Sequence, residues 1–203
     1  MPEIKVIIFD VGGVLVELVG GEKMMEWTAG RYASMPEMYH DWIMCPAVQQ
    51  FERGHCSSDA FSEEVVRDLD LPVSPAEFLE EFMKWPNGLL PGIRETLESV
   101  KQSYSIACLS NTNSAHWYSQ RDTEFLNIIF DNMFLSFQMG MVKPDDEIYR
   151  ETVRRLGTNP EQILFLEDNR VNVEAAARCG INAELALGTE QVRDVLTRYG
   201  CIN

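Results

Sequence analysis

Four short stretches of this chain carry side chains that together could do chemistry on a phosphate group. Carboxylate oxygens are the ligands that Mg²⁺ prefers in proteins, while hydroxyl, amide and ammonium donors bind phosphoryl oxygens. Taken singly, each stretch is equally typical of a turn, a helix cap or an exposed loop. Together they predict a site that binds a metal cation and a phosphate. In chain order they are Asp10, Ser110 with Asn111, Lys143, and Glu167 with Asp168.

An alternation of apolar runs and helical patterns must position these side chains. The runs are rich in β-branched and aromatic residues and nearly continuous, which is typical of strands buried on both faces of a sheet. Apolar stripes at helical spacing lie between them. We therefore predict an α/β fold with a Rossmann-like, doubly wound parallel sheet. The predicted strands are residues 5–9, 105–109, 133–137, 163–166 and 183–187.

The four stretches stand after the first four of these predicted strands. In a doubly wound sheet, the ligand site lies beyond the carboxyl ends of the central strands. The chemistry-bearing side chains are therefore expected to meet at one edge of the sheet.

The segment from about residue 20 to residue 85 breaks the alternation, because its pattern is helical throughout. Ser74-Pro75-Ala76-Glu77 is a capping box with proline at the first helical position, and further prolines divide the segment into several helices. The simplest interpretation is an all-helical cap of residues 16–88, inserted after the first strand. The core domain would then consist of residues 1–15 and 89–203.

Composition limits the classes of partner. The chain has 203 residues and a formal net charge of −15, so nucleic acid and anionic membrane surfaces would be repelled. Five dispersed cysteines argue against a disulfide framework and a structural zinc site. The sequence shows no signal-peptide pattern and no apolar run that would span a bilayer. We expect a cytoplasmic protein, monomeric by default, that acts on a small molecule.

The order of these motifs resembles the haloacid dehalogenase-like (HAD) superfamily. That family has a nucleophilic aspartate after strand one, a Ser or Thr after the next core strand, then a lysine, and finally an acidic pair. This chain has all four in the same order. The resemblance covers the whole chain if residues 16–88 are the helical cap that many members insert there. It implies a phosphohydrolase that uses Mg²⁺ and a covalent aspartyl-phosphate.

The resemblance also implies a role for each residue. Asp10 would attack phosphorus, and Lys143 would neutralise charge on both Asp10 and the phosphate. Ser110 and Asn111 would hold phosphoryl oxygens. Asn172 would orient the acidic loop. The implied magnesium ligands are Asp10, the main-chain carbonyl of Gly12, Glu167 and Asp168.

Gly12 departs from the usual motif of the family's phosphatases. They have a second aspartate there, which protonates the leaving group and later activates water. A branch of the family with Asp-x-Gly motifs resembles this chain more widely, including Phe51-Glu-Arg-Gly54 and Leu109-Ser-Asn-Thr-Asn113. That branch includes sugar-phosphate phosphatases. The resemblance therefore favours a phosphatase for a small phosphate ester, with sugar phosphates as an expected class.

Two other functions stay open. The chain could be a HAD-like binding module with weak or no catalysis, or a 2-haloacid dehalogenase, whose aspartate attacks carbon without that acid or any metal. Glu167 and Asp168 argue against the dehalogenase, because dehalogenases lack a magnesium-binding acid pair there. If the chain is a phosphatase, another group or water would take the place of the missing acid. The candidates are Glu17, His55 and His116, and Arg53 is a candidate contact for substrate.

Overall fold

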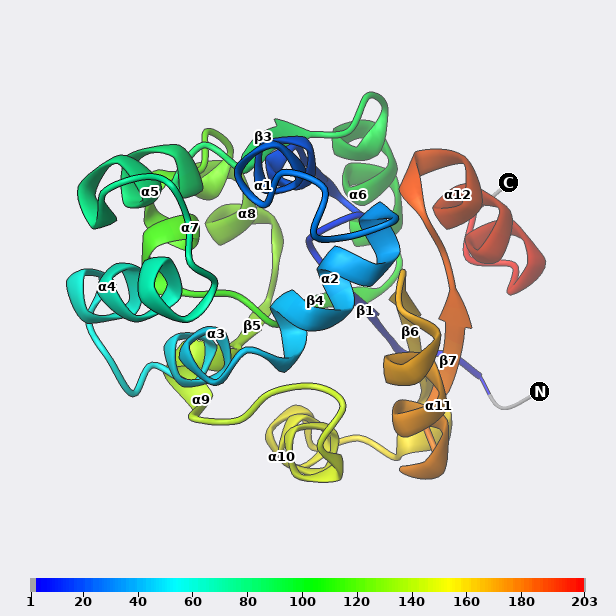
Figure 1. The fold of residues 1–203 in the computed structure, drawn as a ribbon. Helices are drawn as coiled ribbons and strands as arrows, with labels where there is room; N and C mark the ends of the chain where they lie inside the picture. The colour runs from blue at the N-terminus through cyan, green and yellow to red at the C-terminus, as the bar shows by residue number, and fades with distance from the viewer. Residues whose placement is uncertain (1–2, 203) are drawn as a thin grey trace.

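The central sheet confirms the predicted α/β architecture. Residues 3–202 are described by a computed structural model, and within them five parallel strands pair in the order β5-β4-β1-β6-β7 (Figure 1). The central strand β1 pairs with β4 on one side and β6 on the other. The strands are β1 (Val6–Phe9), β4 (Ser105–Ser110), β5 (Asn132–Leu135), β6 (Ile163–Glu167) and β7 (Asn182–Leu185).

Helices cover both faces of this sheet, which explains why its strands read as continuous apolar runs. Successive strand side chains point to opposite faces. Ile7 and Phe9 pack against one helical layer, and Val6 and Ile8 pack against the other. The first layer contains α6 (Ile93–Lys101), α7 (Ser114–Ser119), α8 (Thr123–Ile129) and α12 (Gly188–Arg198). The second contains α10 (Asp146–Leu156) and α11 (Arg170–Arg178).

A helical segment lies between β1 and α6 and has a hydrophobic cluster of its own. The cluster is dominated by aromatic rings, and Phe51 stacks on Phe61 with ring centroids 4.2 Å apart. The capping box predicted at Ser74 and Glu77 is present. The helices are α1 (Gly20–Trp27), α2 (Met35–Met44), α3 (Pro46–Glu52), α4 (Ser58–Asp68) and α5 (Pro75–Phe82).

Two short strands bracket this helical segment, and the sequence did not indicate them. β2 (Val16–Leu18) and β3 (Pro86–Leu89) pair antiparallel, with Val16 opposite Leu89 and Leu18 opposite Pro86. Both ends of the segment predicted as all-helical are therefore extended. The chain leaves the sheet and returns to it through one two-stranded ribbon.

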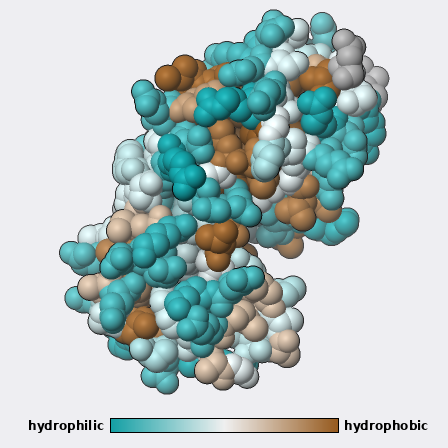
Figure 2. Space-filling model, turned by 90° about the horizontal axis from the view of Figure 1, so that it is seen from above, coloured by the Kyte–Doolittle hydropathy of each residue, from teal (hydrophilic) through white to brown (hydrophobic). Residues whose placement is uncertain are grey.

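The surface view shows two lobes that meet at a narrower waist, with hydrophobic side chains visible at that waist (Figure 2).

None of the helices in residues 3–202 combines the length and the hydropathy needed to cross a membrane. All five cysteines are free thiols. Two short helical turns, α9 (Ser136–Met139) and η1 (Pro160–Gln162), complete the elements of the chain.

Candidate active site

Asp10 lies directly beyond the carboxyl end of the central strand. Its main-chain N–H donates to the carbonyl of Leu166 at 2.9 Å, which continues the β1–β6 ladder by one residue. Its side chain is 9% exposed. The position follows from the strand order, because a residue leaving the central strand is flanked by residues leaving β4 and β6.

The turn after Asp10 brings the chain close to the acidic pair. Gly13 has a φ of +74°, and a Cβ atom there would lie 2.3 Å from Oδ2 of Asp168. A residue with a side chain would have to displace that carboxylate and adopt a strained backbone. Gly12, next to it, lines the same cavity as Asp10.

Lys143 joins the carboxylates of two strands. Its Nζ donates to Oδ1 of Asp10 at 2.8 Å, to Oε2 of Glu167 at 2.6 Å and to the carbonyl of Leu109 at 3.1 Å. Burial disfavours its charge, but the carboxylates of Asp10 and Glu167 hold the pKa of Lys143 above its ordinary value. The group is therefore an ammonium ion at neutral pH, fixed by all three of its N–H bonds.

Asn111 holds the backbone of Lys143, a role that differs from the one predicted for its side chain. Its Nδ2 donates to the carbonyl of Lys143 at 2.9 Å, and its Oδ1 accepts from the N–H of Lys143 at 2.8 Å. The amide group expected to bind phosphoryl oxygens is thus used to position the lysine. Ser110 is buried and lines the cavity that also contains Asp10.

Removing the two hydrogen bonds between the Asn111 side chain and the Lys143 backbone should lower both stability and turnover. We expect Asn111→Ala to lower the free energy of unfolding by about 1–3 kcal/mol, because two buried main-chain groups of Lys143 lose their partners. Turnover should fall with it, since the ammonium group is no longer held in register. Denaturant titration and steady-state kinetics measure the two effects. Asn132→Ala, at the exposed start of β5, is the matched control. Equal effects of the two substitutions would show that the hydrogen bonds from Asn111 to the Lys143 backbone do not cause the loss.

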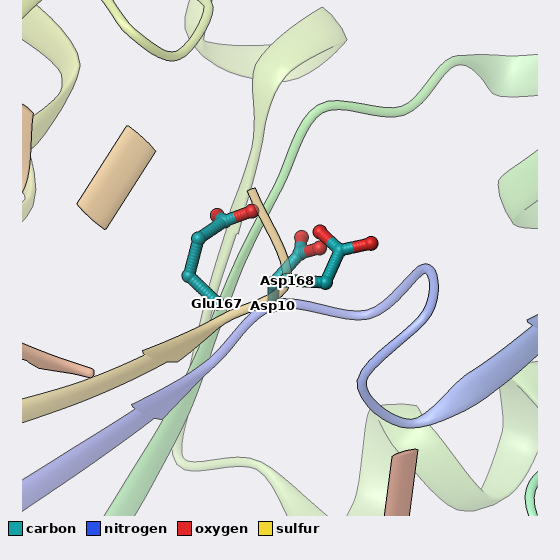
Figure 3. Close-up of side chains that lie close together, drawn as sticks. All are labelled: Asp10, Glu167 and Asp168. Carbon is teal, nitrogen blue, oxygen red and sulfur yellow. The ribbon is translucent and has the colours of Figure 1, made fainter. Parts of the chain in front are cut away.

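The acidic pair lies at the end of β6, beside Asp10. Oε1 of Glu167 accepts from Nδ2 of Asn172 at 3.1 Å and from the N–H of Asn169 at 3.0 Å. Asn172 therefore contacts the acidic loop. Figure 3 shows the side chains of Asp10, Glu167 and Asp168 gathered at the ends of β1 and β6, and their oxygens lie within 4.8 Å of one another.

The electrostatics of this cluster favour a divalent cation. Burial raises the pKa of Asp10 to about 6, although Lys143 opposes the shift. Burial and the neighbouring charge of Asp10 raise the pKa of Asp168 to about 8. Burial also opposes ionisation of Glu167, but Lys143 and its hydrogen bonds keep its pKa below the ordinary value. Three carboxyl groups thus share one ammonium, and a hard cation with oxygen ligands would balance the remaining charge.

A cavity of about 820 Å³ opens above these residues and is closed on its far side by the helical segment. Its floor includes Asp10, Lys143 and Asp168, and its other wall is largely aromatic, with Trp42 and Trp85 among its side chains. This composition is typical of a small-molecule site, in which a few polar groups converge in an apolar enclosure.

The groups considered as replacements for the missing acid lie in different places. Glu17 accepts from Nδ2 of Asn87 at 2.6 Å on the ribbon, and His55 contacts Gln50; neither lines the cavity. His116 does line it, but its Nε2 donates to the carbonyl of Phe82 at 2.8 Å. Burial lowers the pKa of His116 to about 4, so the ring is neutral at neutral pH.

Two residues were assigned differently or missed at the sequence level. Arg53, considered as a substrate contact, forms an ion pair with Asp145 at 2.8 Å. Glu52, its neighbour, was not considered, yet it lines the cavity. The signal that could have found it is the Phe51–Gly54 motif, which contains both Glu52 and Arg53.

Residues 4–180 match the family described as haloacid dehalogenase-like hydrolases. The chain belongs to this family. It is accordingly a hydrolase, and the resemblance of its motifs to the HAD superfamily is confirmed.

Named relatives of this hydrolase include phosphatases. A D-ribitol-5-phosphate phosphatase from Bacteroides thetaiotaomicron is 24% identical over 87% of this chain and 89% of the relative. A sesquiterpene phosphatase from Aspergillus oryzae is 28% identical over 87% of both chains. A solved HAD-family enzyme from Bacteroides thetaiotaomicron, in complex with magnesium and inorganic phosphate, superposes with a TM-score of 0.77 at 22% identity, covering 95% of this chain and 98% of that one. At that identity the superposition supports the shared fold.

Proposed function

We propose that this hydrolase is a magnesium-dependent phosphatase, which cleaves small phosphate esters through an aspartyl-phosphate on Asp10. The observation that carries the proposal is the buried ammonium of Lys143, bonded at once to Asp10 and Glu167. A lysine in this place neutralises charge on the nucleophile and on an approaching phosphoryl group. The named phosphatase relatives support the same reaction class.

The protein residues would divide the work as follows. Asp10 attacks phosphorus, and the P–O bond to the alcohol breaks as the bond to Asp10 forms. Lys143 holds one Asp10 oxygen and stabilises charge on the phosphoryl group. Ser110 donates its hydroxyl to a phosphoryl oxygen, together with main-chain N–H groups of the Ser110–Asn111 turn. In the second half of the reaction, water displaces Asp10 from phosphorus.

Magnesium would be held by the residues at the ends of β1 and β6. Carboxylate oxygens within 4.8 Å of one another, with an excess of acid over ammonium, fit a hard divalent cation. When bound, it would neutralise the charge on the phosphoryl oxygens. The proposed ligands are Asp10, the carbonyl of Gly12, Glu167 and Asp168.

Helices α1–α5 would serve as a cap over the site, with residues 16–88 as the cap domain and residues 1–15 and 89–203 as the core. Their side of the cavity is lined by aromatic side chains, which exclude water. An enclosed site of this size accepts a small molecule rather than a macromolecular phosphate. D-ribitol 5-phosphate is the first candidate, from the relative that hydrolyses it.

The direct test is release of inorganic phosphate from a panel of esters. The panel comprises para-nitrophenyl phosphate, D-ribitol 5-phosphate, other sugar phosphates and a sesquiterpene alcohol phosphate, each with and without Mg²⁺. Turnover that requires Mg²⁺ supports the proposal. Phosphate binding without turnover would favour a binding module, and halide release from 2-haloacids would favour a dehalogenase.

Metal removal gives a prediction with two independent readouts. We expect EDTA to abolish turnover and excess Mg²⁺ to restore it, because the acid cluster binds substrate only when its charge is balanced. Mg²⁺ should also raise the melting temperature, since a ligand that binds the native state stabilises it. Asp168→Asn should weaken both effects, whereas Asp59→Asn, an exposed position on α4, should leave them unchanged. Full activity in EDTA would remove magnesium from the proposal.

A further inference from the structure

The Phe51–Gly54 motif packs the C-terminal end of α3 against the core of the hydrolase. Phe51 is buried among the aromatic rings of the helical segment. Arg53 pairs with Asp145, which precedes α10 on the core. Gly54 has a φ of +71°, and a Cβ atom there would lie 2.2 Å from the carbonyl oxygen of Phe137. The ion pair with Asp145 and the close approach of Gly54 to the Phe137 carbonyl together hold the end of α3 against the core.

Glu52 lies between these anchored residues and lines the cavity shared with Asp10 and Lys143. Glu52 is half-buried, and its pKa depends on this burial and on the charges of Lys143 and Asp10 on the core and of Arg53 at the end of α3. No hydrogen bond contributes to its pKa among the residues that the structure describes. Glu52 thus contributes a carboxyl group to the wall of the cavity that contains Asp10 and Lys143, and that group has no hydrogen-bond partner among the described residues.

We infer that Glu52 is the general acid and base of this hydrolase, supplying from the helical segment the carboxyl group that Gly12 lacks. The inference rests on the proposed phosphatase function. In the first step, the carboxyl of Glu52 gives its proton to the ester oxygen as the P–O bond breaks and the Asp10–P bond forms. In the second, its carboxylate takes a proton from the water whose oxygen bonds to phosphorus as the Asp10–P bond breaks. The alcohol and phosphate leave, and Glu52 is protonated again.

The acidity of Glu52 suits both steps. Burial raises its pKa to about 7, with Asp10 adding to the shift and Lys143 and Arg53 opposing it. A group with a pKa near the working pH can both donate and accept a proton. The other candidates do not combine position and acidity: Glu17 and His55 lie outside the cavity lining, and the neutral His116 donates its Nε2 proton to Phe82.

The decisive variant is Glu52→Gln, compared on two substrates that differ in the basicity of the leaving group. An alkyl phosphate needs a proton on its leaving oxygen, whereas the nitrophenolate of para-nitrophenyl phosphate leaves without one. Loss of a general acid typically costs about 10²–10⁴-fold. We expect a loss of this size in kcat/KM for the best alkyl phosphate of the panel, and a change of less than about tenfold for para-nitrophenyl phosphate. For the second substrate, kcat should still fall, because hydrolysis of the aspartyl-phosphate loses its base.

The pH profile gives a second readout that a structural role would not move. For the alkyl phosphate, kcat/KM of the wild type should fall as pH rises through about 7, where Glu52 loses its proton. This fall of kcat/KM with rising pH should be missing in Glu52→Gln. Glu63→Gln, at an exposed position on α4 outside the cavity lining, makes the same change of charge and should retain both rate and profile.

Restoring a carboxyl at position 12 provides a rescue. A Cβ atom at Gly12 would lie 2.9 Å from Cδ1 of Leu18, the far end of a flexible side chain that is 47% exposed. An aspartate there is therefore accommodated by moving Leu18. The double variant Gly12→Asp with Glu52→Gln should regain at least about tenfold in kcat/KM for the alkyl phosphate over Glu52→Gln alone.

Several outcomes would overturn the inference. Retained activity of Glu52→Gln on the alkyl phosphate, or equal losses on both substrates, would show that Glu52 does not handle the leaving-group proton. Failure of the proposed function looks different, because the wild type itself would then release no phosphate from either substrate. A circular dichroism melt confirms that Glu52→Gln is folded.

Discussion

Asp10→Asn is expected to abolish phosphate release, with a loss on the order of 10⁴-fold or more. An amide cannot attack phosphorus as a carboxylate does, and no other described carboxylate occupies the end of the central strand. The fold should survive, because the substitution keeps the size of the side chain and Lys143 keeps its bond to Glu167. Initial rates on para-nitrophenyl phosphate and a melting curve measure both effects.

The control for this variant is Asp59→Asn, which makes the same chemical change at an exposed position. It should keep wild-type turnover. A burst of para-nitrophenol equal to the enzyme concentration, seen in the wild type and absent in Asp10→Asn, would support the covalent step. Unchanged turnover of Asp10→Asn would rule out Asp10 as the nucleophile.

Lys143→Met is expected to affect stability as strongly as activity. The substitution leaves the buried carboxylates of Asp10 and Glu167 facing each other without their shared ammonium. Breaking one partner out of a buried ion pair typically costs about 3–5 kcal/mol. We expect a loss of this size in the free energy of unfolding, measured by denaturant titration, together with loss of turnover.

The pH dependence of that loss identifies its cause. Without Lys143, the folded-state pKa of Asp10, which burial already raises, should rise further, and that of Glu167 should rise above its unfolded value. Such groups stabilise the fold when protonated, and that stability is lost as pH rises through the folded pKa. The deficit of Lys143→Met should therefore be smaller at about pH 5 than at about pH 8. Lys101→Met, which breaks the exposed ion pair with Asp131, is the control and should cost less than about 1 kcal/mol. A deficit independent of pH would point to packing rather than charge.

The three central strands, β1, β4 and β6, could be predicted because they are buried on both faces, which leaves a continuous apolar run as a signal. The third predicted strand was placed too far along the chain. Residues 133–137 were predicted as a strand, but β5 ends at Leu135 and α9 begins at Ser136. The side chain of Ser136 binds both the N–H and the carbonyl of Thr112 after β4, and this contact between distant segments has no local sequence pattern.

The ribbon β2–β3 could not be predicted for a similar reason. Pro86-Asn-Gly-Leu89 contains a proline and a glycine, which are poor strand formers. The segment is extended because it pairs with residues almost seventy positions earlier, with Leu18 opposite Pro86. Cross-strand partners at this separation leave no periodicity in either segment.

The residues of the site could be predicted, but their contacts could not. Strand ends account for Asp10 and the acidic pair, since parallel strands deliver their carboxyl ends to one edge, whereas Lys143 reaches them from the segment after α9. The hydrogen bonds between Asn111 and Lys143 depend on contact between two loops that are distant in sequence. The position of Glu52 in the cavity wall depends on how α3 packs against the core. The sequence suggested Glu17, His55 and His116 as replacements for the missing acid, whereas the carboxyl group that lines the cavity from the helical segment is that of Glu52.

The ribbon has a consequence for how such a chain can diversify. Because β2 and β3 are paired, the polypeptide departs from the core and rejoins it at neighbouring points. The entropy of closing the loop between those points grows only slowly with the number of residues inserted. Helices can therefore be added, lost or exchanged beyond the ribbon while the core sheet keeps its register. New substrate ranges can arise there, over a hydrolytic centre that the exchange leaves intact.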